Sequence, residues 1–315
     1  MMTFILRKLA STVVVMLVVA VIVFLLIHLS PGDPAAVIAG ERASTEDIEV
    51  IRRSLGLDEP LAYQFVLWLG RLLHGDLGIS LFTRLPVLDL VSQRIEPTLA
   101  LATVTMLFAV ATALPLGILA AWKVGTLIDR AIMGLATIAF SFPIFIIGYG
   151  LVYGFSLKWR LLPVQGYPGL AAGVWPVLQH LILPGLTLGL VFMALLARMT
   201  RSTMIEVLGE DYIRTARAKG LGTSAVLWRH ALKNAAVPIV TTIGTGIALL
   251  IGGVVVTESV FAIPGVGRLT IDAVTQRDYP LIQGVILLSS FAYVVVNLAI
   301  DLSYGLFDPR IRTTA

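Results

Sequence analysis

Residues 206–238 read EVLGEDYIRTARAKGLGTSAVLWRHALKNAAVP and interrupt an otherwise apolar chain. Basic residues gather in this stretch and just before it, between two long apolar runs. They are Arg198, Arg201, Arg214, Arg217, Lys219, Arg229 and Lys233. A polar segment between hydrophobic spans is a place where a membrane protein can meet a soluble partner. Topology alone is the competing explanation, because cytoplasmic loops of membrane proteins carry an excess of Lys and Arg.

The composition indicates a membrane protein. Of the 315 residues, 57% are hydrophobic and only 13% are charged, whereas soluble domains carry about 25% charged residues. The mean hydropathy is +0.93. The absence of cysteine excludes disulfides, thiolate metal sites and cysteine nucleophiles. The net charge of +4 is weak evidence for nucleic-acid binding, since the basic residues lie beside hydrophobic spans.

Six stretches without Asp, Glu, Lys or Arg are long enough to cross a membrane, which takes about 20 apolar residues. They are residues 9–29, 97–122, 131–157, 161–197, 234–257 and 279–300. The fourth opens in a Pro- and Gly-rich loop, so its helix is expected to begin near Trp175 or Pro176. The first is longer than the apolar core of a signal peptide, about 7–15 residues, and we expect it to remain as an uncleaved helix.

Lys and Arg in the short loops predict that both termini are cytoplasmic. In this orientation the outside segments after the third and fifth spans hold only Lys158, Arg160, Arg268 and Arg277. The inside segments hold the basic residues of the central stretch together with Arg7, Lys8, Lys123, Arg130, Arg310 and Arg312. The sequence therefore predicts an all-α membrane protein with six transmembrane helices and cytoplasmic N- and C-termini.

These spans divide the chain into four parts. We expect an N-terminus and first helix at 1–30, an extracytoplasmic loop subdomain at 31–96, a five-helix core at 97–305 with a cytoplasmic loop at about 199–235, and a cytoplasmic tail at 306–315.

The extracytoplasmic loop is long enough to fold on itself. Ser44 and Asp47 resemble a capping box that starts a helix, and Gly56 can end it. Pro60 suits the first turn of a second helix, with apolar residues at Tyr63, Phe65, Leu67 and Trp68. This second helix is too short to cross, so it is expected to lie on the membrane or line a vestibule, as a packed cap rather than a ligand site.

Proline and glycine recur inside the spans, as at Pro115, Pro143 and Pro184. They can serve as hinges of a moving pathway, or simply allow close helix packing.

The residues that would power or catalyse a reaction are missing from the sequence. Ion-coupled carriers need ionisable groups at membrane depth, but the spans contain only His28 and His180, near their ends. The histidines, which also include His74 and His230, are too scattered for a zinc site, and the chain contains neither a G-x-S-x-G nor a Walker motif. No catalytic residue, metal site or cofactor site is expected. If the chain carries out driven transport, the energy must come from another chain.

The central stretch has the pattern of two short helices separated by glycine. Glu210 and Asp211 suit the start of the first helix and the basic residues suit its end, which matches the helix dipole. Glu210 and Arg214 are spaced for an i,i+4 ion pair. Gly220, followed by Gly222, provides a stop. Thr223 or Ser224 can then cap a second helix, which carries Trp228, Leu232, Arg229 and Lys233.

This segment resembles the coupling loop of ABC-importer permeases, whose general pattern is EAA, three residues, Gly and then I-x-L-P. Gly220 fits that pattern, but Arg214-Thr215-Ala216 stands in place of EAA and Ala231-Leu232-Lys233 replaces the later element. Instead, DYxRTARAKGL followed by RHALxNAxxP resembles the form in the dipeptide/oligopeptide/nickel permeases.

The resemblance extends over nearly the whole chain. The matching stretches, in order, are PGDP (31–34), LGLDEPLAYQF (55–65), GDLGIS (75–80), ALPLGILAA (113–121), HLILP (180–184), ESVFAIPGVGRL (258–269), RDYP (277–280) and DPRIR (308–312). It implies a type I importer fold in the inner membrane and transport of di- or oligopeptides. Nickel chelates, glutathione or another small solute remain as alternatives, with an ion-coupled carrier or a purely structural subunit as more distant ones.

The resemblance also implies partners and sites. The partners would be a homologous permease, two ATP-binding subunits that hold ATP and magnesium, an extracytoplasmic solute-binding protein and membrane lipid, but no nucleic acid. The residues implied to contact the ATPase are Asp211, Tyr212, Arg214, Thr215, Ala216, Arg217, Ala218, Lys219, Gly220 and Leu221. Glu258, Pro264 and Gly265 are candidates for an outer gate, although a simple re-entrant turn explains that stretch equally well.

Overall fold

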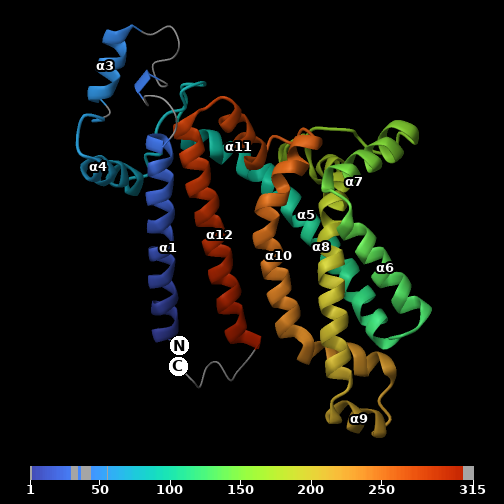
Figure 1. Cartoon of the computed structure of the whole chain (residues 1–315). Helices are drawn as coiled ribbons and strands as arrows, with labels where there is room; N and C mark the ends of the chain where they lie inside the picture. The colour runs from blue at the N-terminus through green and yellow to red at the C-terminus, as the bar shows by residue number, and fades with distance from the viewer. Residues whose placement is uncertain (1, 30–34, 37–43, 55, 308–315) are drawn as a thin grey trace. The chain divides into compact units, whose positions relative to one another are not determined.

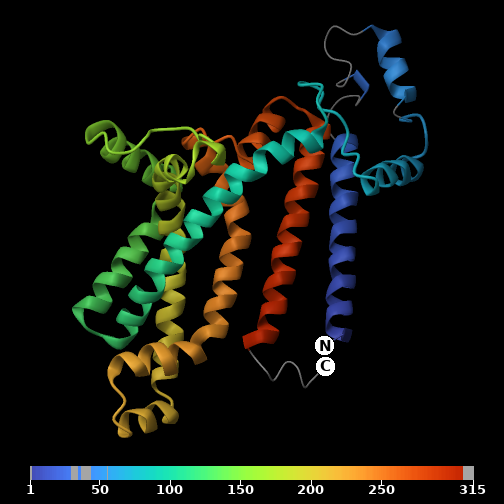
Figure 2. The same cartoon turned by 180° about the vertical axis from the view of Figure 1, so that it is seen from behind.

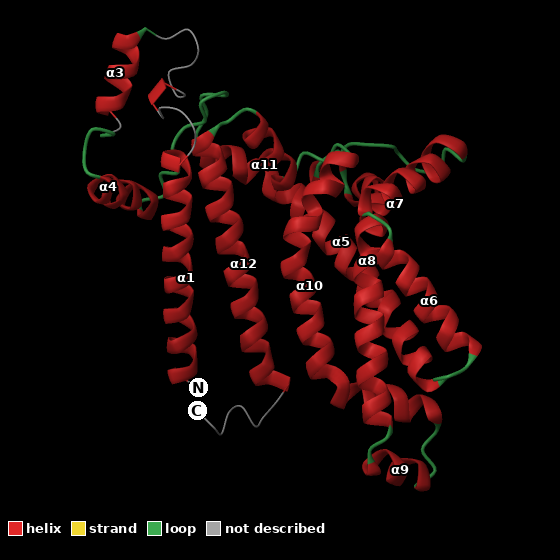
Figure 3. Ribbon diagram, in the orientation of Figure 1, coloured by secondary structure: helices red, strands yellow, loops and turns green. Residues whose placement is uncertain are grey.

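The computed structural model describes residues 2–29, 35–36, 44–54 and 56–307. Across these residues the regular structure is helical, as Figure 3 shows, apart from one isolated bridge between Ile79 and Pro86. The chain divides into two compact units. The first combines Met1–Arg94 with Leu269–Val294, and the second combines Ile95–Arg268 with Val295–Ala315.

The first unit is built on α1 (Met2–Leu29) and the beginning of α12 (Tyr279–Phe307). These helices run antiparallel, side by side (Figures 1 and 2), and bury Ala20, Val23 and Leu287. The Gln283 side chain donates a hydrogen bond of 3.0 Å to the carbonyl of Val23. The short helix α4 (Leu61–Leu73) packs on α1 through aromatic rings, because Phe24 contacts both Phe65 and Trp68.

The two helices predicted within residues 31–96 are confirmed. Helix α3 (Thr45–Ser54) begins directly after Ser44, and α4 begins directly after Pro60. Gly56 has a φ of +68° and ends α3. Its N–H binds the carbonyl of Arg53, and the next N–H, of Leu57, binds that of Arg52, which is a Schellman motif. The Asp47 side chain, PGDP (31–34) and DPRIR (308–312), with Arg310 and Arg312, lie outside the described residues.

The second unit is a helical bundle. Its helices are α5 (Val87–Trp122), α6 (Leu127–Ser141), α7 (Ile144–Leu151) with the π-helical η1 (Val152–Lys158), the short η2 (Leu170–Ala172), α8 (Val174–Leu208), α9 (Asp211–Ala218), the π-helical η3 (Ala225–Ala231) and α10 (Leu232–Val260). Helix α5 enters from the first unit, and α11 (Val266–Thr275) and α12 also continue from one unit into the other.

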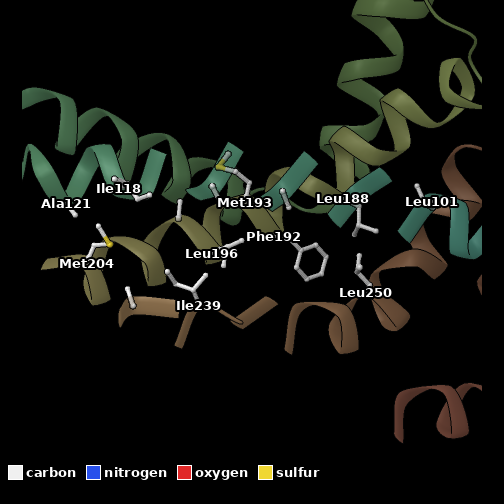
Figure 4. Close-up of a cluster of buried hydrophobic side chains, with 14 of the residues drawn as sticks. Leu101, Ile118, Ala121, Leu188, Phe192, Met193, Leu196, Met204, Ile239 and Leu250 are labelled. Atoms are coloured by element: carbon white, nitrogen blue, oxygen red, sulfur yellow. The ribbon is translucent and has the colours of Figure 1, made fainter. Parts of the chain in front are cut away.

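Helix α8 is the centre of this bundle and contacts α6, α7 and α10. Its buried side chains include Leu188, Phe192 and Leu196, which Figure 4 shows packed with residues from the neighbouring helices. Glycine permits a close approach of α5 to α8. A methyl group on Gly117 would lie 2.8 Å from the carbonyl oxygen of Ala197, and one on Gly189 would lie 2.6 Å from the Phe108 ring. Small residues at helix contacts are typical of membrane bundles.

Four described helices are long and apolar enough to cross a membrane: Arg7–Leu29, Val87–Trp122, Val174–Leu208 and Tyr279–Ile300. They contain the first, second and sixth predicted spans and the helical part of the fourth. The fourth begins at Val174, next to the predicted Trp175. The predicted fifth span, 234–257, lies within α10.

The third predicted span, 131–157, is not one straight helix. It breaks after α6, and the next helical segment, Ile144–Lys158, is turned by 102°. The cause is Pro143, which lacks an N–H and disfavours helical geometry in the residue before it. Phe142 is accordingly extended, with φ −82° and ψ 135°. Pro115 and Pro184, in contrast, lie inside unbroken helices.

Candidate coupling site

Helix α9 lies at one end of the second unit, between α8 and η3 in the chain. Helix α7 lies near the other end of α8 (Figures 1 and 2). Its first residue is Asp211, preceded by an extended Glu210. An acidic side chain in the first turn of a helix is favoured by the helix dipole. The predicted start of this helix is therefore confirmed.

The end of α9 is a Schellman motif around Gly220. The N–H of Gly220 binds the carbonyl of Arg217 at 2.9 Å, and that of Leu221 binds the carbonyl of Ala216 at 3.3 Å. Gly220 has a φ of +80°, a conformation that costs other residues about 1–2 kcal/mol. The predicted glycine stop is confirmed, and its physical reason is the left-handed backbone.

The predicted i,i+4 ion pair is replaced by another. Arg214 lies 3.4 Å from Asp211, not beside Glu210, and both partners are largely exposed. Glu210 precedes the helix in an extended conformation, so its side chain is not stacked one turn below Arg214.

The inner face of α9 packs on its own chain. Ile213 is fully buried and Ala216 is buried, and the core cluster that contains Ile213 also contains Val226 and Leu227 of η3. Ile213 was not among the predicted site residues. The sequence signal for it is an apolar residue followed three positions later by a small one in an otherwise polar helix.

The outer face of α9 carries the other predicted residues. Exposed here are Asp211, Tyr212, Arg214, Thr215, Arg217, Ala218, Lys219, Gly220 and Leu221. Trp228 of η3 is exposed as well. The Tyr212 hydroxyl accepts a hydrogen bond of 2.8 Å from Asn234, which ties α9 to α10. The result is a surface with basic, aromatic and aliphatic groups on a helix whose other face is fixed.

The second helix of the loop runs into α10 without interruption. Thr223 and Ser224 are its first residues rather than its caps, which corrects the prediction. The helix begins one step earlier because the N–H of Val226 binds the carbonyl of Gly222 at 3.1 Å. Helical structure then continues through the π-helical turn η3 to Val260. Such π turns inside helices occur frequently at functional sites.

Glu258 lies near the far end of α10, and its side chain is fully buried. The Thr98 hydroxyl donates a hydrogen bond of 2.6 Å to one carboxylate oxygen, and the N–H of Arg268 donates one of 2.9 Å to the other. Thr98 also accepts a hydrogen bond from the N–H of Val266. Buried carboxylates persist in proteins when such donors satisfy them.

The turn after α10 folds back onto this carboxylate. The N–H of Ile263 binds the carbonyl of Glu258 at 2.9 Å. Gly265 touches the Glu258 side chain so closely that a methyl group there would overlap the carboxylate. The structure thus brings Glu258 and Gly265 together, with Pro264 between Gly265 and Ile263 in the same turn.

Two of the basic residues near the central loop serve the interior of the bundle. Arg201 of α8 forms two hydrogen bonds, of 2.6 and 2.8 Å, with the buried carboxylate of Asp129 in α6. The N–H of Gly125 binds the same carboxylate. Arg198 stacks on the Phe140 ring at 4.8 Å. These contacts fix the helices that carry the loop, and no sequence motif indicates them.

The second unit is thus a bundle of apolar helices that presents an anchored polar helix, α9, at one end. Comparison with known families specifies the class. Residues 113–313 match the family described as "Binding-protein-dependent transport system inner membrane component". Residues 1–102 match "Binding-prot-dependent transport system membrane comp, N-term".

Curated relatives match over almost their whole length. The probable peptide ABC transporter permease protein y4tP of Sinorhizobium fredii is 53% identical, covering 98% of this chain and 99% of the relative. The dipeptide transport system permease protein DppB of Escherichia coli K12 is 41% identical, with 99% of each chain covered. The glutathione transport system permease protein GsiC of the same strain is 42% identical, also with 99% of each covered.

A solved structure shares the fold. An inward-facing MetNI methionine ABC transporter aligns with a TM-score of 0.58 and 17% identity, covering 70% of this chain and 96% of that one. The chain belongs to the binding-protein-dependent transport system inner membrane component family. It is a multi-pass inner-membrane permease subunit of an ABC importer.

Proposed function

We propose that this chain forms half of a translocation pathway for di- or oligopeptides. Its partners are a homologous second permease, two ATP-binding subunits and an extracytoplasmic solute-binding protein. ATP and magnesium bind to the ATP-binding subunits, since this sequence has no phosphate-binding loop. Peptide cargo is supported by the names of the relatives y4tP and DppB.

The observation that carries the coupling proposal is the attachment of α9. Its inner face is buried through Ile213, and its outer face exposes Tyr212, Arg217 and Leu221. An ATPase groove that receives the outer face would therefore move α9, η3 and α10 together. ATP stabilises the closed ATPase pair, and the importer shifts toward the conformation in which the docked loops fit that closed state.

The turn around Pro264 is the proposed outer gate. It joins directly to α10 and is held on Glu258. In this proposal a displacement of α9 reaches the gate through one continuous helical element. The hydrogen bond from the N–H of Arg268 holds the turn to Glu258 of α10, so the turn moves together with the end of that helix.

The cargo has a second candidate. The relative GsiC is named for glutathione, which is itself a small peptide with a γ-linked glutamate. Nickel chelates are a further alternative within the same machinery.

Uptake in proteoliposomes tests the function. The full importer is reconstituted with its binding protein, and uptake of a labelled dipeptide is compared with that of labelled glutathione and a nickel chelate. We expect dipeptide uptake that needs ATP on the ATPase side and persists without an ion gradient. Uptake driven by a proton or sodium gradient without ATP would overturn the mechanism, and uptake of only glutathione or nickel would reassign the cargo.

A further inference from the structure

A cavity of about 430 Å³ lies in the first unit, where α1, α4 and the start of α12 meet. Its volume falls within the range of small-molecule sites, about 300–1,000 Å³. Its walls are mainly apolar and aromatic, with Phe24, Ile27, Trp68, Ile79 and Pro280 among them. Neither the coupling loop nor the proposed gate contributes to it.

The polar groups deep in this cavity are already satisfied by the protein. His28 and Gln64 are joined by a hydrogen bond of 3.0 Å. The Gln64 amide also donates to the carbonyls of Leu57 and Glu59, at 3.1 and 2.8 Å. His28 and Gln64 therefore form part of the cavity wall, and polar contacts with a ligand are expected from residues at the rim.

The rim is basic. Arg71 and Arg84 line the cavity and are exposed, and neither makes an ion pair with a carboxylate of the residues that the structure describes. The rim also carries the carboxylate of Asp76, which accepts a hydrogen bond of 2.9 Å from the N–H of Gly78. With two guanidinium groups and one carboxylate, the rim has a net positive charge that favours an anion.

Arg84 is held at the rim in a strained conformation. Its φ is +60°, which is uncommon for a residue other than glycine, and such outliers gather at functional sites. Its turn is closed by hydrogen bonds from the N–H of Ser80 to Leu85 and from that of Arg84 to Ser80.

The turn is also fixed to α12. The buried carboxylate of Asp278 accepts hydrogen bonds from the Ser80 hydroxyl, at 2.5 Å, and from the N–H of Leu81. It accepts another from the N–H of Leu281 in the first turn of α12. The loop is thus a rigid support for Arg84.

The cavity lies at the end of two candidate membrane spans. Phe24, Ile27 and His28 belong to the last turns of Arg7–Leu29, and Pro280 and Gln283 to the first turns of Tyr279–Ile300. The 13-residue α4 is too short to cross. It exposes Val66, Leu67 and Leu73, as expected of a helix lying on a membrane surface. A cavity at the end of such spans is expected to lie at the depth of lipid headgroups.

We propose that this cavity binds a phospholipid. The phosphodiester is held by Arg71 and Arg84, because the planar guanidinium fork matches phosphate oxygens. The glycerol backbone and the first carbons of the acyl chains lie against Phe24, Ile27 and Trp68. Tryptophan beside an apolar wall and a charged rim is typical of the membrane–water interface. The ligand must combine an anionic phosphate with an apolar body.

Native mass spectrometry of the complete importer, with phosphatidylglycerol added, tests the site. We expect the double substitution Arg71→Gln and Arg84→Gln to weaken lipid retention about tenfold or more, since two charge-assisted contacts are lost. Arg160→Gln is the matched control. Arg160 is also exposed and has a φ of +54°, but it lies in the second unit. This control is expected to retain lipid as the wild type does.

A second variant separates lipid binding from folding. Arg84→Gly removes the guanidinium and also relieves the left-handed backbone, so the fold is retained while lipid is lost. Inorganic phosphate and glycerol phosphate are not expected to displace the lipid. Equal retention in the double variant overturns the proposal. Displacement by inorganic phosphate identifies a free-anion site instead, and displacement by a labelled dipeptide identifies a substrate site.

Discussion

The carboxylate of Asp129 accepts hydrogen bonds of 2.6 and 2.8 Å from the guanidinium of Arg201, a residue 72 positions later in the chain. The pair is largely buried and joins the start of α6 to α8, close to the point where α8 leads into the proposed coupling loop. Removing one partner of a buried pair leaves an uncompensated charge.

We expect Asp129→Ala to destabilise the subunit by up to about 3–5 kcal/mol, nearer the lower figure because Arg201 is partly exposed. The measurement is thermal unfolding of the purified importer. Combining Asp129→Leu with Arg201→Met should recover most of the loss, because apolar replacements remove both charges. The exposed pair of Asp211 and Arg214 is the control, and Asp211→Asn should leave the unfolding temperature unchanged. An Asp129→Ala variant as stable as the wild type would contradict the structural role of the pair.

Substitutions at Gly220 distinguish the effect of its backbone conformation from the effect of ATPase docking. A Cβ atom added at Gly220 would have no atom within 4 Å other than those of its two chain neighbours, but the φ of Gly220 is +80°. Gly220→Val should therefore disorder the end of α9 and reduce peptide-stimulated ATP hydrolysis severalfold. Gly220→Asn, which tolerates this conformation, should retain most activity unless the ATPase approaches the backbone closely.

Gly222 is the matched control for this experiment. It has the same open surroundings without a positive φ, so Gly222→Ala should behave as the wild type. Full activity of Gly220→Val would show that the Schellman turn is dispensable.

Two alanines of α9 should respond differently to enlargement. Ala216 is buried and Ala218 is exposed. Ala216→Leu overpacks the buried face of α9 and should cost about 1–3 kcal/mol of stability. Ala218→Leu should leave stability unchanged and reduce ATPase binding if that surface docks, which co-purification of the ATP-binding subunits measures. Equal unfolding temperatures for the two variants would mean that α9 does not pack as described.

The turn at Gly265 should open when its contact with Glu258 is crowded. Gly265→Ala forces the carboxylate and the turn apart. The chain contains no cysteine, so Ile263→Cys supplies a single reporter at a fully buried position. We expect a membrane-impermeant thiol reagent to label this cysteine faster in the Gly265→Ala background. Unchanged labelling would show that the turn tolerates the added methyl group.

Tyr167 provides a spectroscopic prediction. Burial, together with a hydrogen bond of 2.9 Å to Glu96, raises the pKa of Tyr167 to about 12, from 10.0. Because the folded-state pKa is raised, the stabilising contact is fully present below pH 10 and is lost as the pH rises through about 12. The difference in tyrosinate absorbance between the wild type and Tyr167→Phe should titrate near that value. A midpoint at pH 10 would mean that the hydrogen bond is absent in solution.

Local features of this protein were predictable from sequence because their causes are local. Apolar stretches predicted the positions of most spans. Gly56 and Gly220 predicted two helix ends, and at both the backbone is left-handed. The sequence shows Pro143 but does not predict the helix break there, because prolines do not always break a helix. Pro115 and Pro184 lie inside unbroken helices. Whether a proline bends a membrane helix depends on neighbours that satisfy the freed carbonyls.

The interactions that sequence reasoning missed join residues far apart. Asp129 with Arg201, and Thr98 with Glu258, have no shared spacing that a pattern could reveal. The Asn234 contact with Tyr212 likewise depends on how α9 folds back. Charge and family resemblance predicted the outer residues of the proposed coupling site. They did not predict its inner anchor, Ile213, whose burial is known only from the packing in the structure.

In the proposed mechanism, the unbroken helix that begins in the coupling loop would act as a lever arm. The α10 segment alone has 29 residues, a length of about 43 Å at the usual helical rise. A tilt of about 10° around its midpoint would move each end by about 4 Å, in opposite directions, for a rod of that length. A small rocking of α9 would thus be enough to shift the Glu258 turn by the width of an atom or more, without any change in the helix itself.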